Sequence, residues 1–141
     1  MIYITRKLDF CASHRLFNPD FTEEQNKAAF GLCSNPNGHG HTYTLEVTIR
    51  GEVNPQTGMI MDFKNLKELV KAEIIHKVDH KNLNVDVPFL DGVISTVENM
   101  AVAFWRILEP RITNGVLHEI KLYESERNYV VYRGKSHERV G

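Results

Sequence analysis

The sequence predicts an α+β domain in which four antiparallel strands form one sheet and two helices pack on one of its faces. Segments with the two-residue period of strands come in pairs towards both ends of the chain, and two segments with helical spacing lie between them. The resulting order contains no β-α-β alternation, which argues against a parallel sheet. With 141 residues, 42% of them hydrophobic, the chain fits one domain, residues 1–141, with its own core.

The first two strands are predicted from residue 2 to His14 and from His39 onward. In the first strand the apolar residues share one parity, which only Arg6 interrupts, and His14 continues it. In the second strand His39 and His41 share the parity of the apolar residues. Both strands are therefore expected to have one face in the core. Cys11 lies within the first strand, and we expect it to be a small buried residue.

A long structured loop is predicted between these strands, at residues 18–38. It contains a short amphiphilic stretch with a capping box, Thr22 and Gln25, at its start and Gly31 as its stop. A loop of this length in a small domain is usually functional.

The two main helices follow the second strand. Asp62 is expected to cap the first of them. The second is expected to begin at Ser95 or Thr96, because Ser95 and Glu98 have the spacing of a capping box, and to end near Pro110.

The last two strands are predicted at residues 116–124 and 129–133. In the first of them Val116, Ile120 and Leu122 share one parity with His118 and Glu124, so we expect all five on the core-facing side. A carboxylate there needs a partner, and the amidine-like edge of a ligand would serve because it offers two parallel N–H groups. The alternative is that Glu124 ends the strand and faces water.

Composition excludes several classes of function. The net charge is −1, from 17 basic and 18 acidic residues spread along the chain, which argues against a nucleic-acid partner. The N-terminus reads as a strand and not as a signal peptide, and no apolar run approaches the roughly 18 residues of a membrane span. We therefore expect a cytoplasmic protein with no membrane partner, in which Cys11 and Cys33 are thiols.

Three histidines predict a metal site. The rings of His39 and His41 project from one face with Cβ atoms about 6 to 7 Å apart, a span that one metal ion can bridge. His14 reaches the same face from the neighbouring strand. Three neutral imidazoles suit Zn²⁺ and leave a fourth position open, as in catalytic zinc sites, and Gly38 and Gly40 would allow close approach to the metal. The alternative is a turn with incidental histidines.

Two further groups could move protons. Cys33 lies six residues before His39 and could fold back over the metal, which would lower the pKa of its thiol. Asp79 and His80 lie where the first main helix ends. Such a pair either caps the helix terminus and compensates its charge or acts as a general acid and base. Glu98 is explained by the capping box alone.

At these residues the sequence resembles the 6-pyruvoyl-tetrahydropterin synthase family. The matching stretches are FCASHRL at 10–16, CSNPNGHGH at 33–41, DHKNL at 79–83, STVEN at 95–99 and YES at 123–125. The resemblance implies a T-fold (tunnelling fold), in which three subunits close a β-barrel and two trimers stack into a homohexamer with active sites at the subunit interfaces. It also implies a lyase that converts 7,8-dihydroneopterin triphosphate to 6-pyruvoyl-tetrahydropterin with loss of triphosphate, in tetrahydrobiopterin biosynthesis.

The resemblance carries roles onto particular residues. It implies that His14, His39 and His41 bind Zn²⁺, with Mg²⁺ as a further requirement for activity. Cys33 would be the general base, and Asp79 and His80 its proton relay. Glu124 would anchor the pterin, and Thr96 and Glu98 are further candidates for binding the substrate.

Two other functions stay open on the sequence. The related 6-carboxy-tetrahydropterin synthases of queuosine biosynthesis act on the same substrate, but their cysteine typically stands closer to His-Gly-His than Cys33 does here. A non-catalytic pterin- or metal-binding module is the second alternative. Cys33 and the Asp79-His80 pair argue against it, since binding alone needs neither.

Overall fold

The structure is a computed structural model that describes residues 1–135, so residues 136–141 of the predicted domain lie outside the described part. Its sheet has the strand order β3-β1-β2-β4-β5. The strands are β1 (Ile2–His14), β2 (His39–Gly51), β3 (Lys81–Asn82), β4 (Val116–Tyr123) and β5 (Tyr129–Tyr132). The helices are α1 (Glu23–Phe30), α2 (Phe63–Val70), α3 (His76–Val78) and α4 (Val97–Leu108), with a π-helical segment (Lys71–Ile75) between α2 and α3.

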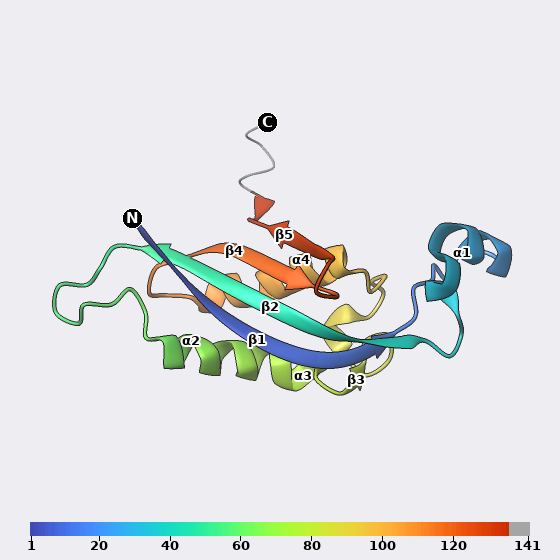
Figure 1. Cartoon of the computed structure of the whole chain (residues 1–141), viewed down its shortest axis with the longest axis horizontal. Coiled ribbons are helices and arrows are strands. Elements are labelled where there is room, and N and C mark those ends of the chain that lie inside the picture. Colours follow the sequence, from blue (N-terminus) through green and yellow to red (C-terminus); the bar gives the residue numbers. More distant parts are fainter. Residues whose placement is uncertain (136–141) are drawn as a thin grey trace.

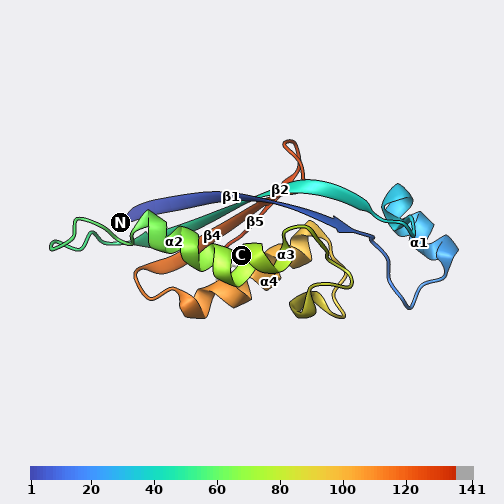
Figure 2. The same ribbon diagram turned by 90° about the horizontal axis from the view of Figure 1, so that it is seen from below.

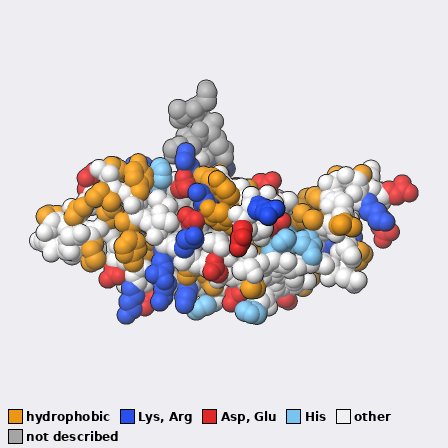
Figure 3. Space-filling model, viewed as in Figure 1, with side chains coloured by type: hydrophobic (Ala, Val, Ile, Leu, Met, Phe, Trp, Pro, Cys, Tyr) orange, Lys and Arg blue, Asp and Glu red, His pale blue; other side chains and the backbone are white. Residues whose placement is uncertain are grey.

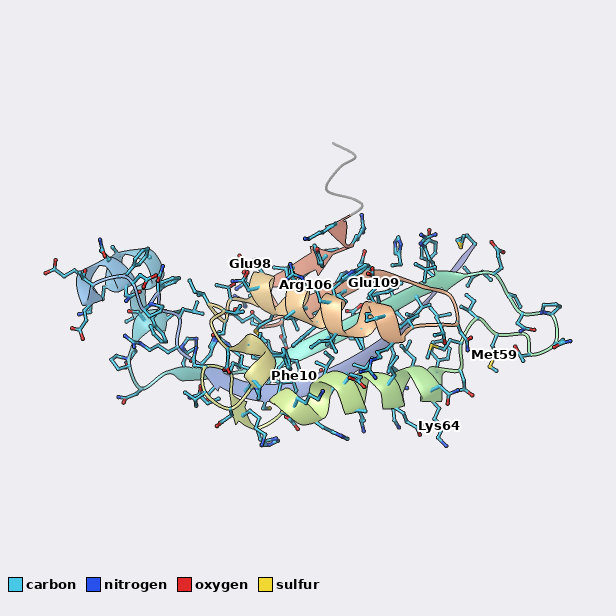
Figure 4. The ribbon with its side chains drawn as sticks, turned by 180° about the vertical axis from the view of Figure 1, so that it is seen from behind. Phe10, Met59, Lys64, Glu98, Arg106 and Glu109 are labelled. Atoms are coloured by element: carbon cyan, nitrogen blue, oxygen red, sulfur yellow. The ribbon has the colours of Figure 1, made fainter. Side chains whose placement is uncertain are left out.

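The two long helical stretches, α2 to α3 and α4, cover one face of the sheet, as predicted (Figures 1 and 2). The core lies between these two layers. There Phe10 of β1 stacks on Tyr43 of β2, with ring centroids 4.8 Å apart, and meets the edge of Phe104 from α4. Figure 4 shows Phe10 between the sheet and the helices, whereas Glu98 and Arg106 lie along the outer side of α4. In residues 1–135 no helix has the length and apolar character that crossing a membrane requires.

Strands β1 and β2 pair along their whole lengths, which brings their histidines together. The antiparallel register places His14 opposite His39 and Ala12 opposite His41. Core-facing residues alternate with exposed or partly exposed ones along both strands, so the predicted parity is confirmed.

The sheet differs from the prediction at β3, which makes it a mixed five-stranded sheet and not a four-stranded antiparallel one. β3 pairs parallel to β1, with Ala12 opposite Lys81, and the Leu83 N–H continues the pairing by donating to the Ser13 carbonyl at 2.8 Å. A strand of two residues has no periodicity, so the sequence pattern could not reveal it.

The predicted face of β4 was wrong at its start. Leu117 is 4% exposed and Val116 is 51% exposed, the reverse of the expectation. A bulge opposite Thr48 and Ile49 inserts one extra residue and inverts the parity before it. His118 consequently lies edge-on to the exposed Tyr3, with ring centroids 4.6 Å apart, and not in the core.

Two smaller expectations were also wrong. Cys11 is exposed, because its neighbours Phe10 and Ala12 take the core-facing positions, and its Sγ lies 3.6 Å from Thr42 Oγ1. Helix α4 is capped by Thr96, whose hydroxyl accepts from the Asn99 N–H at 3.2 Å, so the predicted capping box of Ser95 and Glu98 does not form.

Candidate metal centre and active site

Three histidines converge at one end of the sheet. The candidate ligand nitrogens of His14, His39 and His41 all lie within 4.8 Å of one another. His14 is 1% exposed, whereas the other two rings are partly open to the surface. Figure 3 shows histidine side chains at the surface where the sheet meets residues 15–38, the projecting segment that carries α1. The predicted ligand set is therefore assembled within a single chain.

The surroundings of His14 and His41 favour the neutral form of both rings, and those of His14 also orient it. The Nδ1–H of His14 donates to the Ser95 carbonyl at 2.8 Å, which leaves Nε2 with its lone pair. Burial lowers the pKa of His14 to about 4, against a smaller raising effect of the Ser95 bond. Burial also lowers the pKa of His41, and Glu124 partly offsets that effect. Neutral imidazoles are the form that binds metal.

The donor atoms fit a metal ion. Among the described residues, Nε2 of His39 and Nε2 of His41 are buried and make no hydrogen bond, although a carboxylate oxygen of Glu124 lies 3.5 Å from the latter. A buried nitrogen without a partner is unfavourable, and a metal ion bound by all three rings would satisfy both atoms. Three nitrogen ligands and no thiolate leave an open coordination position.

Gly38 closes the turn into β2. Its φ is +73°, and a Cβ atom there would lie 3.0 Å from the His14 carbonyl oxygen. Glycine is therefore needed at this position for its backbone conformation and for the close approach. At Gly40 a Cβ atom would make an ordinary contact 3.7 Å from the Ala12 carbonyl oxygen, and the expected close approach to a metal there stays a prediction.

Glu124 follows the end of β4 and reaches the histidines, since the parity after the bulge is the predicted one. Its Oε1 lies 3.5 Å from Nε2 of His41, and its side chain is 26% exposed. The hydroxyl of Tyr43 lies 3.5 Å from Nε2 of His14. Burial, with Glu124 as the smaller cause, raises the pKa of Tyr43, so this phenol stays protonated.

Asp79 and His80 form the predicted pair. Nδ1 of His80 lies 3.0 Å from Oδ1 of Asp79, and the Cys11 N–H donates to the same oxygen at 2.9 Å. That backbone bond is the main reason why the pKa of Asp79 is lowered. His80 has a φ of +60° and a side chain that is 81% exposed. It lines an open depression of about 670 Å³ beside Cys11 and Thr42.

Cys33 does not join the histidine cluster within one chain. It lies in the 3₁₀ turn Gly31–Ser34 of the projecting segment, and its carbonyl accepts from the Leu16 N–H at 2.8 Å. In residues 1–135 the close group of possible metal ligands consists of the three histidines alone. The expected folding of Cys33 over the metal is therefore not seen in the isolated chain.

Thr96 and Glu98, the further candidates for substrate binding, lie at the start of α4. Thr96 caps the helix, and Glu98 is exposed in its first turn (Figure 4). Their predicted role stays a prediction.

Sequence reasoning missed Ser95 and Asn84. Ser95 is 0% exposed, and its carbonyl and hydroxyl both face His14. The Asn84 carboxamide donates to the Ser95 hydroxyl at 3.2 Å. Ser95 precedes a helix that either it or Thr96 could have capped, so the pattern offered no signal for its contact with a histidine far away in the sequence.

Known proteins resemble this chain over nearly its whole length. The sequence model described as 6-pyruvoyl tetrahydropterin synthase matches residues 3–135. A 6-pyruvoyl tetrahydrobiopterin synthase of Pongo abelii is 47% identical over 94% of this chain and 91% of its own length. A 6-carboxy-5,6,7,8-tetrahydropterin synthase of Rickettsia typhi is 29% identical over 92% of this chain and 99% of its own.

A solved structure agrees with the sequence comparison. The 6-pyruvoyl tetrahydropterin synthase of Caenorhabditis elegans superposes with a TM-score of 0.89 at 37% identity, over 95% of this chain and 96% of that one. The fold, the extent of the match and the identity to named relatives agree, and the chain belongs to the 6-pyruvoyl tetrahydropterin synthase family.

Proposed function

We propose that this chain is a zinc-dependent lyase that converts 7,8-dihydroneopterin triphosphate to 6-pyruvoyl-tetrahydropterin, with elimination of triphosphate, in tetrahydrobiopterin biosynthesis. The observation that carries the proposal is the cluster of three histidines whose ligand atoms lie within 4.8 Å of one another, in a chain that shares 47% identity with a 6-pyruvoyl tetrahydrobiopterin synthase. Enzymatic activity follows from family membership, and the residue roles below are our proposals.

His14, His39 and His41 are the proposed zinc ligands. When bound, the ion would act as a Lewis acid that acidifies the C–H bonds beside the hydroxyls of the substrate side chain. Mg²⁺ is proposed as a second requirement for activity.

Proton movements are assigned to the other candidate residues. The Cys33 thiolate would take a proton from a side-chain carbon of the substrate. The His80 imidazole would exchange protons with the substrate, with the Asp79 carboxylate 3.0 Å from its Nδ1 holding the ring in place. The Glu124 carboxylate would accept two N–H bonds from the guanidine-like edge of the pterin, and Thr96 and Glu98 stay candidates for further substrate contacts.

The proposed active site needs neighbouring subunits. Leu32, beside Cys33, is 92% exposed on the projecting segment, and the side chain of His80 is 81% exposed. A large exposed apolar residue next to a proposed base favours docking against another copy. Pairing of the free sheet edges between subunits would close the barrel of the T-fold. We propose a homohexamer, a dimer of trimers; the cytoplasmic location stays a prediction.

The 6-carboxy-tetrahydropterin synthase activity is the alternative within the family. The interval from Cys33 to His39 favours the pyruvoyl product, as does the lower identity, 29%, to the Rickettsia typhi relative. A non-catalytic binding module is disfavoured, because binding requires neither Cys33 nor the Asp79-His80 pair.

Incubation of purified, zinc-loaded protein with 7,8-dihydroneopterin triphosphate tests the proposal. Mass spectrometry should identify 6-pyruvoyl-tetrahydropterin and released triphosphate. Chelator-treated protein is the control, and activity should return with Zn²⁺ but not with Mg²⁺ alone. Formation of the 6-carboxy product would favour the alternative, and zinc-loaded protein that binds the pterin without turnover would indicate a binding module.

A further inference from the structure

Asn84 joins two segments that flank a proposed zinc ligand. It lies shortly after β3, in a turn where its N–H donates to the Asn82 side chain at 2.9 Å. Its Oδ1 accepts from the Arg15 N–H at 2.7 Å, and its Nδ2 donates to the Arg15 carbonyl at 3.1 Å. The same Nδ2 donates to the Ser95 hydroxyl at 3.2 Å. One carboxamide therefore holds the backbone of one segment and a side chain of the other.

Both partners of Asn84 are in direct contact with His14 or covalently joined to it. Arg15 follows His14 in the chain, so its backbone position sets where the histidine Cα lies. The Ser95 carbonyl accepts the Nδ1–H of His14 at 2.8 Å, and the Ser95 hydroxyl lies 3.3 Å from the same nitrogen. The orientation of the His14 ring thus depends on the distance between Arg15 and Ser95, which Asn84 spans.

We propose that Asn84 is a positioning residue for the metal site, which keeps Nε2 of His14 directed at the ion by tying Arg15 to Ser95. This inference rests on the proposed zinc site. Asn84 acts through its partners and touches neither metal nor substrate. Groups that orient a ligand in this way typically change metal affinity by about 10- to 100-fold when they are removed.

Asn84→Leu is the main test, because leucine keeps a similar volume and makes no hydrogen bond. Chelator competition should show Zn²⁺ affinity about 10- to 100-fold weaker than in the unaltered protein. The visible spectrum of the Co²⁺-loaded protein should also change, since it reports ligand geometry. Asn84→Asp should recover only part of the affinity, because a carboxylate can accept from the Arg15 N–H and the Ser95 hydroxyl but cannot donate to the Arg15 carbonyl.

Asn26 provides a matched control elsewhere in the chain. Its Oδ1 accepts from the Asn18 N–H at 2.8 Å and its Nδ2 donates to the Asn18 carbonyl at 3.2 Å, the same two-bond grip on one backbone residue. Asn26 is 5% exposed, in α1, and is bonded to no zinc ligand. Asn26→Leu should lower stability while Zn²⁺ affinity stays unchanged.

Ser95→Ala tests the inference even if Asn84→Leu fails to fold. It keeps the carbonyl that accepts from His14 and removes the hydroxyl, which Asn84 holds and which lies 3.3 Å from Nδ1 of His14, so Zn²⁺ affinity should fall by about three- to tenfold. Unchanged affinity in the folded Asn84→Leu or Ser95→Ala variant overturns the inference and leaves the proposed function intact. Equal weakening by Asn26→Leu overturns it as well. An unaltered protein that binds no Zn²⁺ overturns both.

Discussion

The proposed ligand His14 is 1% exposed and donates to a backbone carbonyl, whereas Leu32, the neighbour of the proposed base Cys33, is 92% exposed on a projecting segment. The proposed metal ligands lie on two long strands, whose register places His14 opposite His39. The proton-transfer candidates stand on surface segments: Cys33 in a short turn and His80 at a helix end. The difference indicates that one chain assembles the histidine cluster by itself, whereas the rest of the proposed active site would need association with neighbouring subunits.

Removal of one metal ligand should have the largest effect. His39→Ala is expected to abolish zinc binding and turnover while the fold survives, since the apolar face of β2 remains. Metal analysis measures zinc binding, and circular dichroism measures whether the fold survives. The exposed His76→Ala is the control. Full zinc occupancy in His39→Ala would rule out this ligand set.

Removal of the proposed base tests the other half of the comparison. Cys33→Ala should lower kcat by about 10² or more, with zinc content and substrate affinity nearly unchanged. Cys11→Ala, at the exposed thiol of β1, should be close to normal. Near-normal turnover by Cys33→Ala would end the case for a cysteine base.

Mixing the variants asks whether different chains supply the two groups. Co-expressed Cys33→Ala and His80→Ala subunits should regain activity that neither homo-oligomer has, if each active site takes its groups from different chains. Light scattering of the same samples should show a closed oligomer. No recovery in proven mixed oligomers would place both groups on one chain.

Glu124 shares a feature with each group of residues. It lies close to His41, one of the proposed metal ligands, but its side chain is partly exposed, like the proton-transfer candidates. Glu124→Gln keeps the volume and removes the charge, so KM should rise by about 10- to 100-fold, the scale of one or two hydrogen bonds to a charged group. Zinc content should not change. A variant with unchanged KM and kcat/KM would contradict the anchoring role.

Gly38 connects the projecting segment to β2, the strand that carries His39 and His41. Gly38→Ala should destabilise the protein by about 1 to 2 kcal/mol from its left-handed backbone, and more from the contact with His14. Gly58 has a φ of +72° but open space around it, so Gly58→Ala isolates the backbone effect. Denaturant unfolding compares the stability that each variant loses. Equal losses in Gly38→Ala and Gly58→Ala would show that the close approach to His14 does not affect stability.

The smallest expected effect concerns pH. The pKa of Asp79 is lowered in the folded chain, so its charge contributes stability above the ordinary value of 3.8 and loses this contribution as the pH falls through the lowered value. Asp79→Asn should therefore be less stable than the unaltered chain at neutral pH, and the gap should narrow below pH 3.8. Unfolding of metal-free samples measures the difference in stability between the two proteins. A difference that persists in acid would contradict the lowered pKa of Asp79.

Some of these features could be predicted because they repeat along a strand. The alternation of apolar residues located the first two strands and placed three histidines on one face. It could do so because side chains two residues apart on a strand project from the same face. The same alternation should have placed Cys11 outside the core, since its parity is opposite to that of Phe10. The predicted orientation of Val116 and His118 was wrong for another reason, because a bulge leaves no mark in a hydrophobic pattern.

The sequence by itself determined the positions of the two long strands, the helical stripes and the shared face of His39 and His41, since each depends on neighbours within a few residues. Only the tertiary structure decided that β3 pairs with β1, that Thr96 and not Ser95 caps α4, and that Ser95 holds His14. That last contact joins residues 81 positions apart. A single hydrogen bond between two loops depends on how every element between them packs, so no local pattern can encode it.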